Sequence, residues 1–146
     1  MNQVGHWISG AEVLSKSGRL GDIYDPALGE VTKHVGFANQ AEINQTIASA
    51  KAAFPAWRDA TLAKRQGVIF RFRELLDARK GELAAIITEE HGKVLSDALG
   101  EITRGQEVVE FACGMPQLLK GEYSENASTN VDVYSIKQPL GVVGIC

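Results

Sequence analysis

The first 38 residues alternate apolar and polar positions over short runs, and turn residues separate the runs. The clearest run is residues 31–37, which has the two-residue period of a β-strand. Just before it, residues 25–29 (DPALG) predict a turn, because Pro26 presets φ and Gly29 adopts backbone conformations that other residues resist. We therefore expect residues 1–38 to form short strands joined by turns.

A first helix is expected to begin at Asn39. Asn is a favoured N-cap, and Glu42 three residues later completes a capping box. Apolar residues then recur at helical spacing and place one apolar face on this helix: Ile43, Ile47, Ala50 and Phe54. Pro55 is expected to end the helix, with Trp57 at the corner that follows.

Two more helices are expected next. Thr61 is a candidate N-cap for a helix that runs to about Arg79 and is broken by Gly81. A short third helix is expected to end at His91, with Gly92 as the left-handed residue that terminates it.

The longest helical period in the sequence runs from about residue 94 to about residue 119. One apolar side extends along it and consists of Leu95, Leu99, Ile102, Val109 and Cys113. A second apolar side appears only in its latter half, at Val108, Phe111 and Met115. Such a helix is expected to be covered on two sides. Gly100 and Gly105 lie within it and predict that another backbone element approaches closely there.

The C-terminal part is expected to return to strand structure. Residues 121–130 are polar and are interpreted as a connector, and residues 131–138 alternate as in an exposed antiparallel strand. Residues 140–145 are apolar without alternation, as in a strand buried on both faces of a parallel α/β sheet. The overall fold class predicted from these patterns is α/β.

Composition narrows the function classes. The chain has 146 residues, 45% of them apolar and 23% charged, with a net charge of −3. These values are typical of a globular domain, and Lys and Arg form no basic stripe that would favour nucleic acid. No apolar run is long enough for a membrane span, and residues 1–10 do not resemble a secretory signal. With only two cysteines, we expect a cytoplasmic protein.

Few residues carry candidate chemistry. Motifs for nucleotide binding, for zinc proteases and for serine hydrolases are absent, and the three histidines lie far apart in sequence, so no metal site is expected. Cys113 is interpreted as a small buried apolar residue, and Cys146 has no neighbour that would lower its pKa. The pairs Glu89–Glu90 and Glu107–Glu110 are interpreted as solvated helix faces. The sequence therefore predicts no catalytic residue.

Arg104 is the one candidate binding residue, and it lies on the second side of the long helix. One reading is an ion pair with Glu101 or Glu107, each three residues away. The other reading is an anion binder that grips a carboxylate through two parallel hydrogen bonds.

The order of landmarks resembles the N-terminal part of the aldehyde dehydrogenase superfamily. The shared landmarks are WISG at 7–10, DPA at 25–27, GEV at 29–31, AKAAFPAW at 50–57, EHGK at 90–93 and QPLGVV at 138–143. Three further runs resemble the CoA-acylating methylmalonate-semialdehyde dehydrogenases, and these are FRFRELL at 70–76, DALGEITRGQEVVEFAC at 97–113 and LKGEYSEN at 119–126.

This resemblance implies a Rossmann-type enzyme, usually a dimer or tetramer, that oxidises methylmalonate or malonate semialdehyde. NAD accepts the hydride, CoA takes the acyl group and CO2 is lost, as in valine catabolism. An arginine in the Gly-Glu-x-x-Arg-Gly context holds the substrate carboxylate in that subfamily, which here implies Arg104. The implied divisions are a β/turn region at 1–38, helices at 39–120, an oligomerisation strand region at 121–138 and the start of the NAD-binding sheet at 139–146.

The resemblance does not extend to the catalytic residues of the family. In that family the oxyanion-hole asparagine, the nucleotide contacts, the catalytic cysteine and the general-base glutamate all follow the strand that begins at Pro139. We therefore expect a truncated, N-terminal fragment that is inactive by itself. Two alternatives stay open, namely a fragment of a non-acylating aldehyde dehydrogenase and a noncatalytic interaction module that uses residues 131–138 and the second side of the long helix.

Overall fold

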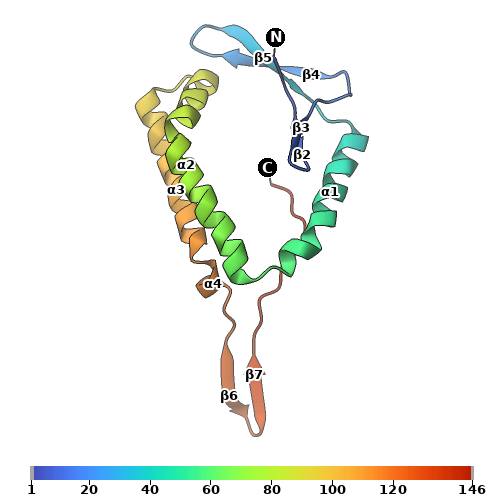
Figure 1. Ribbon diagram of the computed structural model, residues 1–146, viewed down its shortest axis with the longest axis vertical. Coiled ribbons are helices and arrows are strands. Elements are labelled where there is room, and N and C mark those ends of the chain that lie inside the picture. The colour runs from blue at the N-terminus through green and yellow to red at the C-terminus, as the bar shows by residue number, and fades with distance from the viewer. Residues whose placement is uncertain (1, 146) are drawn as a thin grey trace.

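The computed structural model describes residues 2–145, which form a ring with a hairpin projecting from it (Figure 1). A sheet lies at the top of the ring in that view, α1 forms one side, and α2 with α3 forms the other. The elements in chain order are β1 (Asn2–Val4), β2 (His6–Ile8), β3 (Ala11–Val13), β4 (Leu20–Asp25), β5 (Glu30–Gly36), α1 (Gln40–Arg58), α2 (Leu62–His91), α3 (Leu95–Cys113), α4 (Met115–Leu118), β6 (Tyr123–Ser128) and β7 (Val131–Tyr134).

The N-terminal β region confirms the predicted strands and turns. Strand β5 lies between β1, which is parallel to it, and β4, which is antiparallel, while β2 and β3 form a separate hairpin. The turn between β4 and β5 closes through a 2.8 Å hydrogen bond from the Gly29 N–H to the Asp25 carbonyl. Gly29 has φ +72°, the left-handed conformation that the sequence predicts for a glycine here.

Helix α1 begins as predicted, with a complete capping box. The Asn39 side chain accepts a hydrogen bond from the Glu42 N–H at 3.0 Å, and the Glu42 carboxylate accepts one from the Asn39 N–H at 2.8 Å. The predicted stop at Pro55 is wrong, because the helix continues to Arg58. A proline lacks an N–H donor but its carbonyl still accepts, and here the Asp59 N–H donates to it at 3.0 Å, so the last turn is completed.

Helix α2 replaces the two helices expected between Thr61 and Gly92. The Thr61 side chain caps it as predicted, by accepting from the Lys64 N–H at 3.2 Å, and Gly92 ends it with φ +80°. Gly81 does not break it. A glycine costs a helix only about 1 kcal/mol relative to alanine, and packing of α2 against α3 along its length outweighs that cost.

Helix α3 confirms most of the long helical period, which Gly114 interrupts before the single turn of α4. Its packed side carries Ala98 and Cys113, which are 0% and 7% exposed. Gln66 of α2 fixes the end of α3, because its Nε2 donates to the Cys113 carbonyl at 2.7 Å. The first apolar side of the predicted helix is therefore the α2 contact.

Residues 121–145 differ from the sequence expectation in two places. The segment interpreted as a polar connector contains strand β6, which pairs with β7 in an antiparallel hairpin. Residues 140–145 were expected to form a buried strand, but the structure assigns none there, and Leu140 and Ile145 are 96% and 92% exposed. A parallel strand needs a neighbouring strand reached through a crossover, and within residues 2–145 no strand lies beside this segment.

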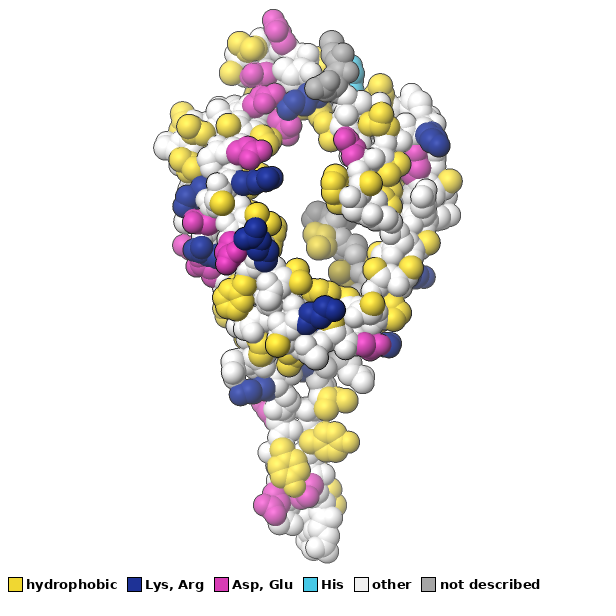
Figure 2. Space-filling view, in the orientation of Figure 1, with side chains coloured by type: hydrophobic (Ala, Val, Ile, Leu, Met, Phe, Trp, Pro, Cys, Tyr) yellow, Lys and Arg dark blue, Asp and Glu magenta, His cyan; other side chains and the backbone are white. Residues whose placement is uncertain are grey.

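Little of this fold is buried. The accessible surface is 10935 Å² for 15.8 kDa, whereas a compact monomer of that mass exposes about 7,300 Å². Large apolar side chains line the surface, including the rim of the central opening (Figure 2). Within residues 2–145, no helix is long and apolar enough to cross a membrane.

The Glu42 carboxylate ties the loop after β3 to the start of α1. It accepts hydrogen bonds from the Lys16 N–H at 2.6 Å and from the Ser15 hydroxyl at 2.9 Å, besides the Asn39 N–H. These bonds, the one from Lys16 first, lower the pKa of Glu42. The carboxylate therefore contributes stability that is present above its unfolded pKa and is lost as pH falls through its folded pKa.

We predict that Glu42→Gln destabilises the chain at neutral pH and that the difference from the wild type shrinks between about pH 5 and about pH 3. Urea unfolding followed by circular dichroism at each pH measures the difference. Glu82→Gln, at an exposed position of α2 without an ion pair among the described residues, is the matched control. A difference between Glu42→Gln and wild type that is constant with pH would contradict the assignment.

Candidate functional site

The second side of α3 is uncovered. Val108 and Phe111 are 68% and 70% exposed, in contrast to the side that faces α2. The sequence predicts that this second apolar side is covered, but no element within residues 2–145 covers Val108 or Phe111. The uncovered side is the surface on which the candidate residue Arg104 lies.

Arg104 is exposed and is free of ion pairs and side-chain hydrogen bonds within the described part of the chain. The predicted ion pair with Glu101 is not formed, because the Glu101 carboxylate is paired with the Lys93 Nζ at 2.9 Å. Lys93 is also the main cause that lowers the pKa of Glu101, and Arg104 contributes only a minor part. The guanidinium of Arg104 is thus available to an anion from outside this chain.

The glycines on either side of Arg104 do not mark a close backbone approach within this chain. A Cβ atom added at Gly100 or Gly105 would meet no atom within 4 Å. Gly105 instead lines an apolar cleft of about 380 Å³ between α2 and α3. The expectation of an approaching element is therefore wrong for residues 2–145, and the space beside these glycines is open.

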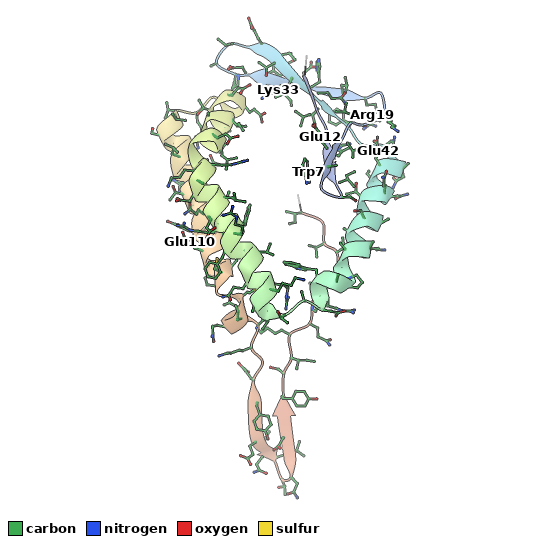
Figure 3. All side chains as sticks on the ribbon, in the orientation of Figure 1. Trp7, Glu12, Arg19, Lys33, Glu42 and Glu110 are labelled. Carbon is green, nitrogen blue, oxygen red and sulfur yellow. The ribbon has the colours of Figure 1, made fainter. Side chains whose placement is uncertain are left out.

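A polar network connects α3 to α2 beside the buried apolar contact. The Arg73 Nε of α2 donates to the Glu110 carboxylate at 2.8 Å, and the buried Gln106 Nε2 donates to the same oxygen at 3.1 Å. Arg73, ahead of Gln106, lowers the pKa of Glu110. Glu110 lies on the side of the α2–α3 pair that faces away from the central opening (Figure 3).

The two acidic pairs lie on exposed helix faces, as the sequence predicts, and three of the four carboxylates also form ion pairs. Glu110 is bound by Arg73, whereas its partner Glu107 has no ion pair within residues 2–145. Glu89 and Glu90 both contact the Lys33 Nζ, at 3.0 and 3.4 Å, and join the end of α2 to β5. The Glu89 carboxylate is the main cause that raises the pKa of Lys33. These carboxylates therefore support the structure, and they do not form an acid–base pair.

Cysteine and histidine provide no reactive centre here. Cys113 is a free thiol that is 7% exposed against α2, as predicted, and Cys146 lies outside the described residues. His91 ends α2 as predicted, and His6 and His34 lie in β2 and β5. Residues 2–145 contain no group of three His, Cys, Asp or Glu side chains arranged to hold a metal ion.

The structure also brings three basic residues together in a way that the sequence does not indicate. Arg58, Arg65 and Lys137 line one pocket, although the last is more than 70 residues from the others. They come from α1, α2 and the segment after β7, so no local spacing relates them.

Known proteins share this arrangement of elements. Residues 13–146 match the aldehyde dehydrogenase family. The chain belongs to that family. The malonate-semialdehyde dehydrogenase of Pseudomonas aeruginosa is 45% identical over 143 residues, which is 98% of this chain and 29% of that protein. The human mitochondrial acylating methylmalonate-semialdehyde/malonate-semialdehyde dehydrogenase is 43% identical over 93% of this chain and 25% of its own length.

Solved structures agree with this family assignment. A structure described as a methylmalonate-semialdehyde dehydrogenase of Sinorhizobium meliloti 1021, complexed with NAD, superposes with a TM-score of 0.92 at 43% identity. It is matched over 97% of this chain and 29% of its own chain. The methylmalonate-semialdehyde dehydrogenase of Oceanimonas doudoroffii superposes with a TM-score of 0.91 at 44% identity. The aldehyde dehydrogenase fold predicted from the sequence is confirmed, and the chain corresponds to an N-terminal part that spans 24–29% of these relatives.

The two sides of α3 predict different mutational costs at adjacent positions. Val109→Ala removes apolar contact with α2 and is expected to lower the free energy of unfolding by about 1–2 kcal/mol. Val108→Ala, on the uncovered side, is expected to change it by less than about 0.5 kcal/mol. Chemical unfolding of the two variants measures both values. Equal costs would show that the Val108 side is packed in solution.

Proposed function

We propose that this chain is the N-terminal part of an NAD-dependent, CoA-acylating methylmalonate- or malonate-semialdehyde dehydrogenase. The reaction converts the semialdehyde, CoA and NAD into propionyl-CoA or acetyl-CoA, CO2 and NADH. The names of the relatives at 41–45% identity support this substrate class. A cytoplasmic location and a role in valine catabolism belong to the same proposal.

Arg104 carries the proposal. It is an exposed cation on the uncovered side of α3, and within residues 2–145 its guanidinium has no partner. A semialdehyde substrate of this class bears a carboxylate at the end opposite its aldehyde, and a guanidinium binds a carboxylate through two parallel hydrogen bonds. We assign Arg104 the role of holding that carboxylate, with α3, packed against α2, as its support.

The reacting groups are assigned to the parts of the family fold that this chain does not span. Two observations support this assignment: residues 140–145 pair with no strand within residues 2–145, and the chain has no Gly-x-Gly-x-x-Gly loop. Cys113 is buried and is unsuited to attack an aldehyde. We therefore propose that the 146-residue chain alone does not turn over, and that residues 139–146 begin the NAD-binding sheet of the full fold.

The role of Arg104 is tested in a completed enzyme. Residues 1–146 are joined to the remaining part of the Pseudomonas relative, and NADH formation is measured with malonate semialdehyde and with propanal, which lacks the carboxylate. We predict that Arg104→Ala lowers kcat/KM for malonate semialdehyde about 10- to 100-fold and leaves propanal nearly unchanged. The physical reason is the loss of a charge-assisted hydrogen-bonded pair.

Two controls make that experiment specific. Arg79→Ala removes an exposed arginine of α2 that has no ion pair among the described residues, and it is expected to leave both substrates unaffected. The 146-residue chain without the joined part is expected to give no NADH. Equal losses with both aldehydes in Arg104→Ala would remove the carboxylate role. Dependence of the rate on CoA separates the acylating reaction from the alternative, a non-acylating aldehyde dehydrogenase.

A specific observation favours a second function, subunit contact through the β6–β7 hairpin. Tyr123, Val131, Val133 and Tyr134 are 48–72% exposed on a hairpin that projects from the ring (Figure 1). Its shape is set internally, because the Asp132 carboxylate accepts from the Tyr123 hydroxyl at 2.8 Å and from the Asn126 N–H at 2.9 Å. We propose that residues 121–138 form an oligomerisation arm. As a noncatalytic interaction module, the chain would use this arm together with the second apolar side of α3.

We predict that the chain self-associates through the hairpin, because a preformed strand pair with apolar side chains buries them against a second copy. Size-exclusion chromatography with light scattering, over a range of concentrations, measures the mass. Val133→Lys is expected to shift the chain toward monomer, since it places a charge on the strand, whereas Val94→Lys, at an exposed position before α3, is the matched control. A concentration-independent monomer mass for the wild type would contradict the arm.

A further inference from the structure

The pocket that contains the three basic residues is lined by the end of α1, the start of α2 and the segments that flank the β6–β7 hairpin. These elements meet at the base of the hairpin (Figure 1). The volume of the pocket is about 300 Å³. Since a water molecule occupies about 30 Å³ in the liquid, this space has room for a small ligand. Four segments form its wall, and their lining residues are Arg58, Leu62, Arg65, Leu119, Lys137, Gln138 and Pro139.

The charges around this pocket have one sign. No Asp or Glu belongs to its lining residues. The Arg58 guanidinium is compensated from outside the lining, because its Nε and Nη2 donate to the Asp59 carboxylate at 2.6 and 2.9 Å. Arg65 and Lys137 have no ion pair with any residue in the range 2–145. Two positive charges at the pocket are therefore uncompensated.

Arg65 adds an independent observation. Its Nε atom is buried and has no acceptor within the described part of the chain. Buried donors in folded proteins are nearly always paired, so this atom indicates a missing acceptor. The position of the pocket also favours an anion. It adjoins the first turn of the 30-residue helix α2, where the helix dipole is positive and no acidic side chain is present.

We propose that this pocket binds an anionic group, a carboxylate or a phosphate, held by the Arg65 guanidinium and the Lys137 ammonium. Arg65 supplies the planar, directional contact, and Lys137 supplies a charge on an extended segment. The site is separate from Arg104, which lies on α3, and it stands whether or not the proposed dehydrogenase reaction is correct. The group is either a free small anion or an acidic side chain of another protein segment.

Nuclear magnetic resonance titration of the 146-residue chain tests the proposal. The Nε–Hε signal of Arg65 is assigned by its loss in Arg65→Gln, and it is followed as inorganic phosphate, succinate or a short glutamate-rich peptide is added. We expect saturable shifts of this signal at millimolar concentrations of phosphate or succinate. Tighter binding of the peptide identifies a protein segment as the source of the anionic group, and tighter binding of phosphate or succinate identifies a free anion.

Matched variants show whether the site is built from these two residues. The shifts of backbone signals in the first turn of α2 report binding in every variant. Lys137 lies outside any helix or strand, so we expect Lys137→Gln to leave the fold intact. Lys137→Gln and Arg65→Gln are each expected to weaken binding about tenfold. Arg79→Gln makes the same change on the same helix away from the pocket and is expected to have no effect.

Two results would overturn the proposal. One is the absence of a saturable shift with all three probes. The other is an equal weakening in Arg79→Gln and Arg65→Gln, which would indicate attraction to the net charge of α2 without a defined site. Lys137→Gln keeps the test decisive if Arg65→Gln disturbs the start of the helix.

Discussion

The packing of α3 along α2 is the interaction on which the rest of this structure depends. The contact between the two helices contains most of the buried side chains, and the Arg73–Glu110–Gln106 network adds hydrogen bonds across it. A carboxylate shared between a guanidinium and a buried amide accepts in well-defined directions, so the two helices have little freedom to rotate. The packing buries one side of α3 and leaves the side with Arg104 uncovered.

The other contacts that connect the elements of the ring are polar and lie near the surface. Lys33 connects β5 to the two glutamates at the end of α2, and Glu42 connects the loop after β3 to α1. Apolar surface near the opening, such as Trp7 on β2, which is 75% exposed, stays uncovered (Figure 3). The chain spans 24–29% of the relatives that it matches, and this excess of exposed apolar surface is what a part of a larger fold presents.

This geometry leaves two cationic sites, one at Arg104 and one at Arg65, and the two differ in their exposure to solvent. Arg104 is exposed on a helix face, where solvent screens its charge until another surface covers it. Arg65 is partly enclosed, with a buried and unpaired donor, so its interaction with an anion is screened less. We propose a substrate carboxylate as the ligand of the first, supported by the names of the relatives, and an anion as the ligand of the second, supported only by the geometry of its pocket.

The sequence by itself determined the features that depend on neighbouring residues. The turn at Gly29, the capping box of Asn39 and Glu42, the Thr61 cap and the left-handed Gly92 form through contacts within a few residues, and each is present. The two-sided character of α3 and the place of Arg104 on its second side follow from helical period alone. The family landmarks likewise identified the aldehyde dehydrogenase fold, which residues 13–146 confirm.

Only the tertiary structure decided the features that depend on distant partners. Helix α2 continues through Gly81 because α3 packs against it, and the polar sequence of β6 becomes a strand because β7 pairs with it. Residues 140–145 have a strand composition but no adjacent strand, so they stay unpaired. The pocket with Arg65 and Lys137 joins segments more than 70 residues apart. The spacing of neighbouring residues in the sequence carries no information about such contacts, because only the folding of the whole chain brings the distant segments together.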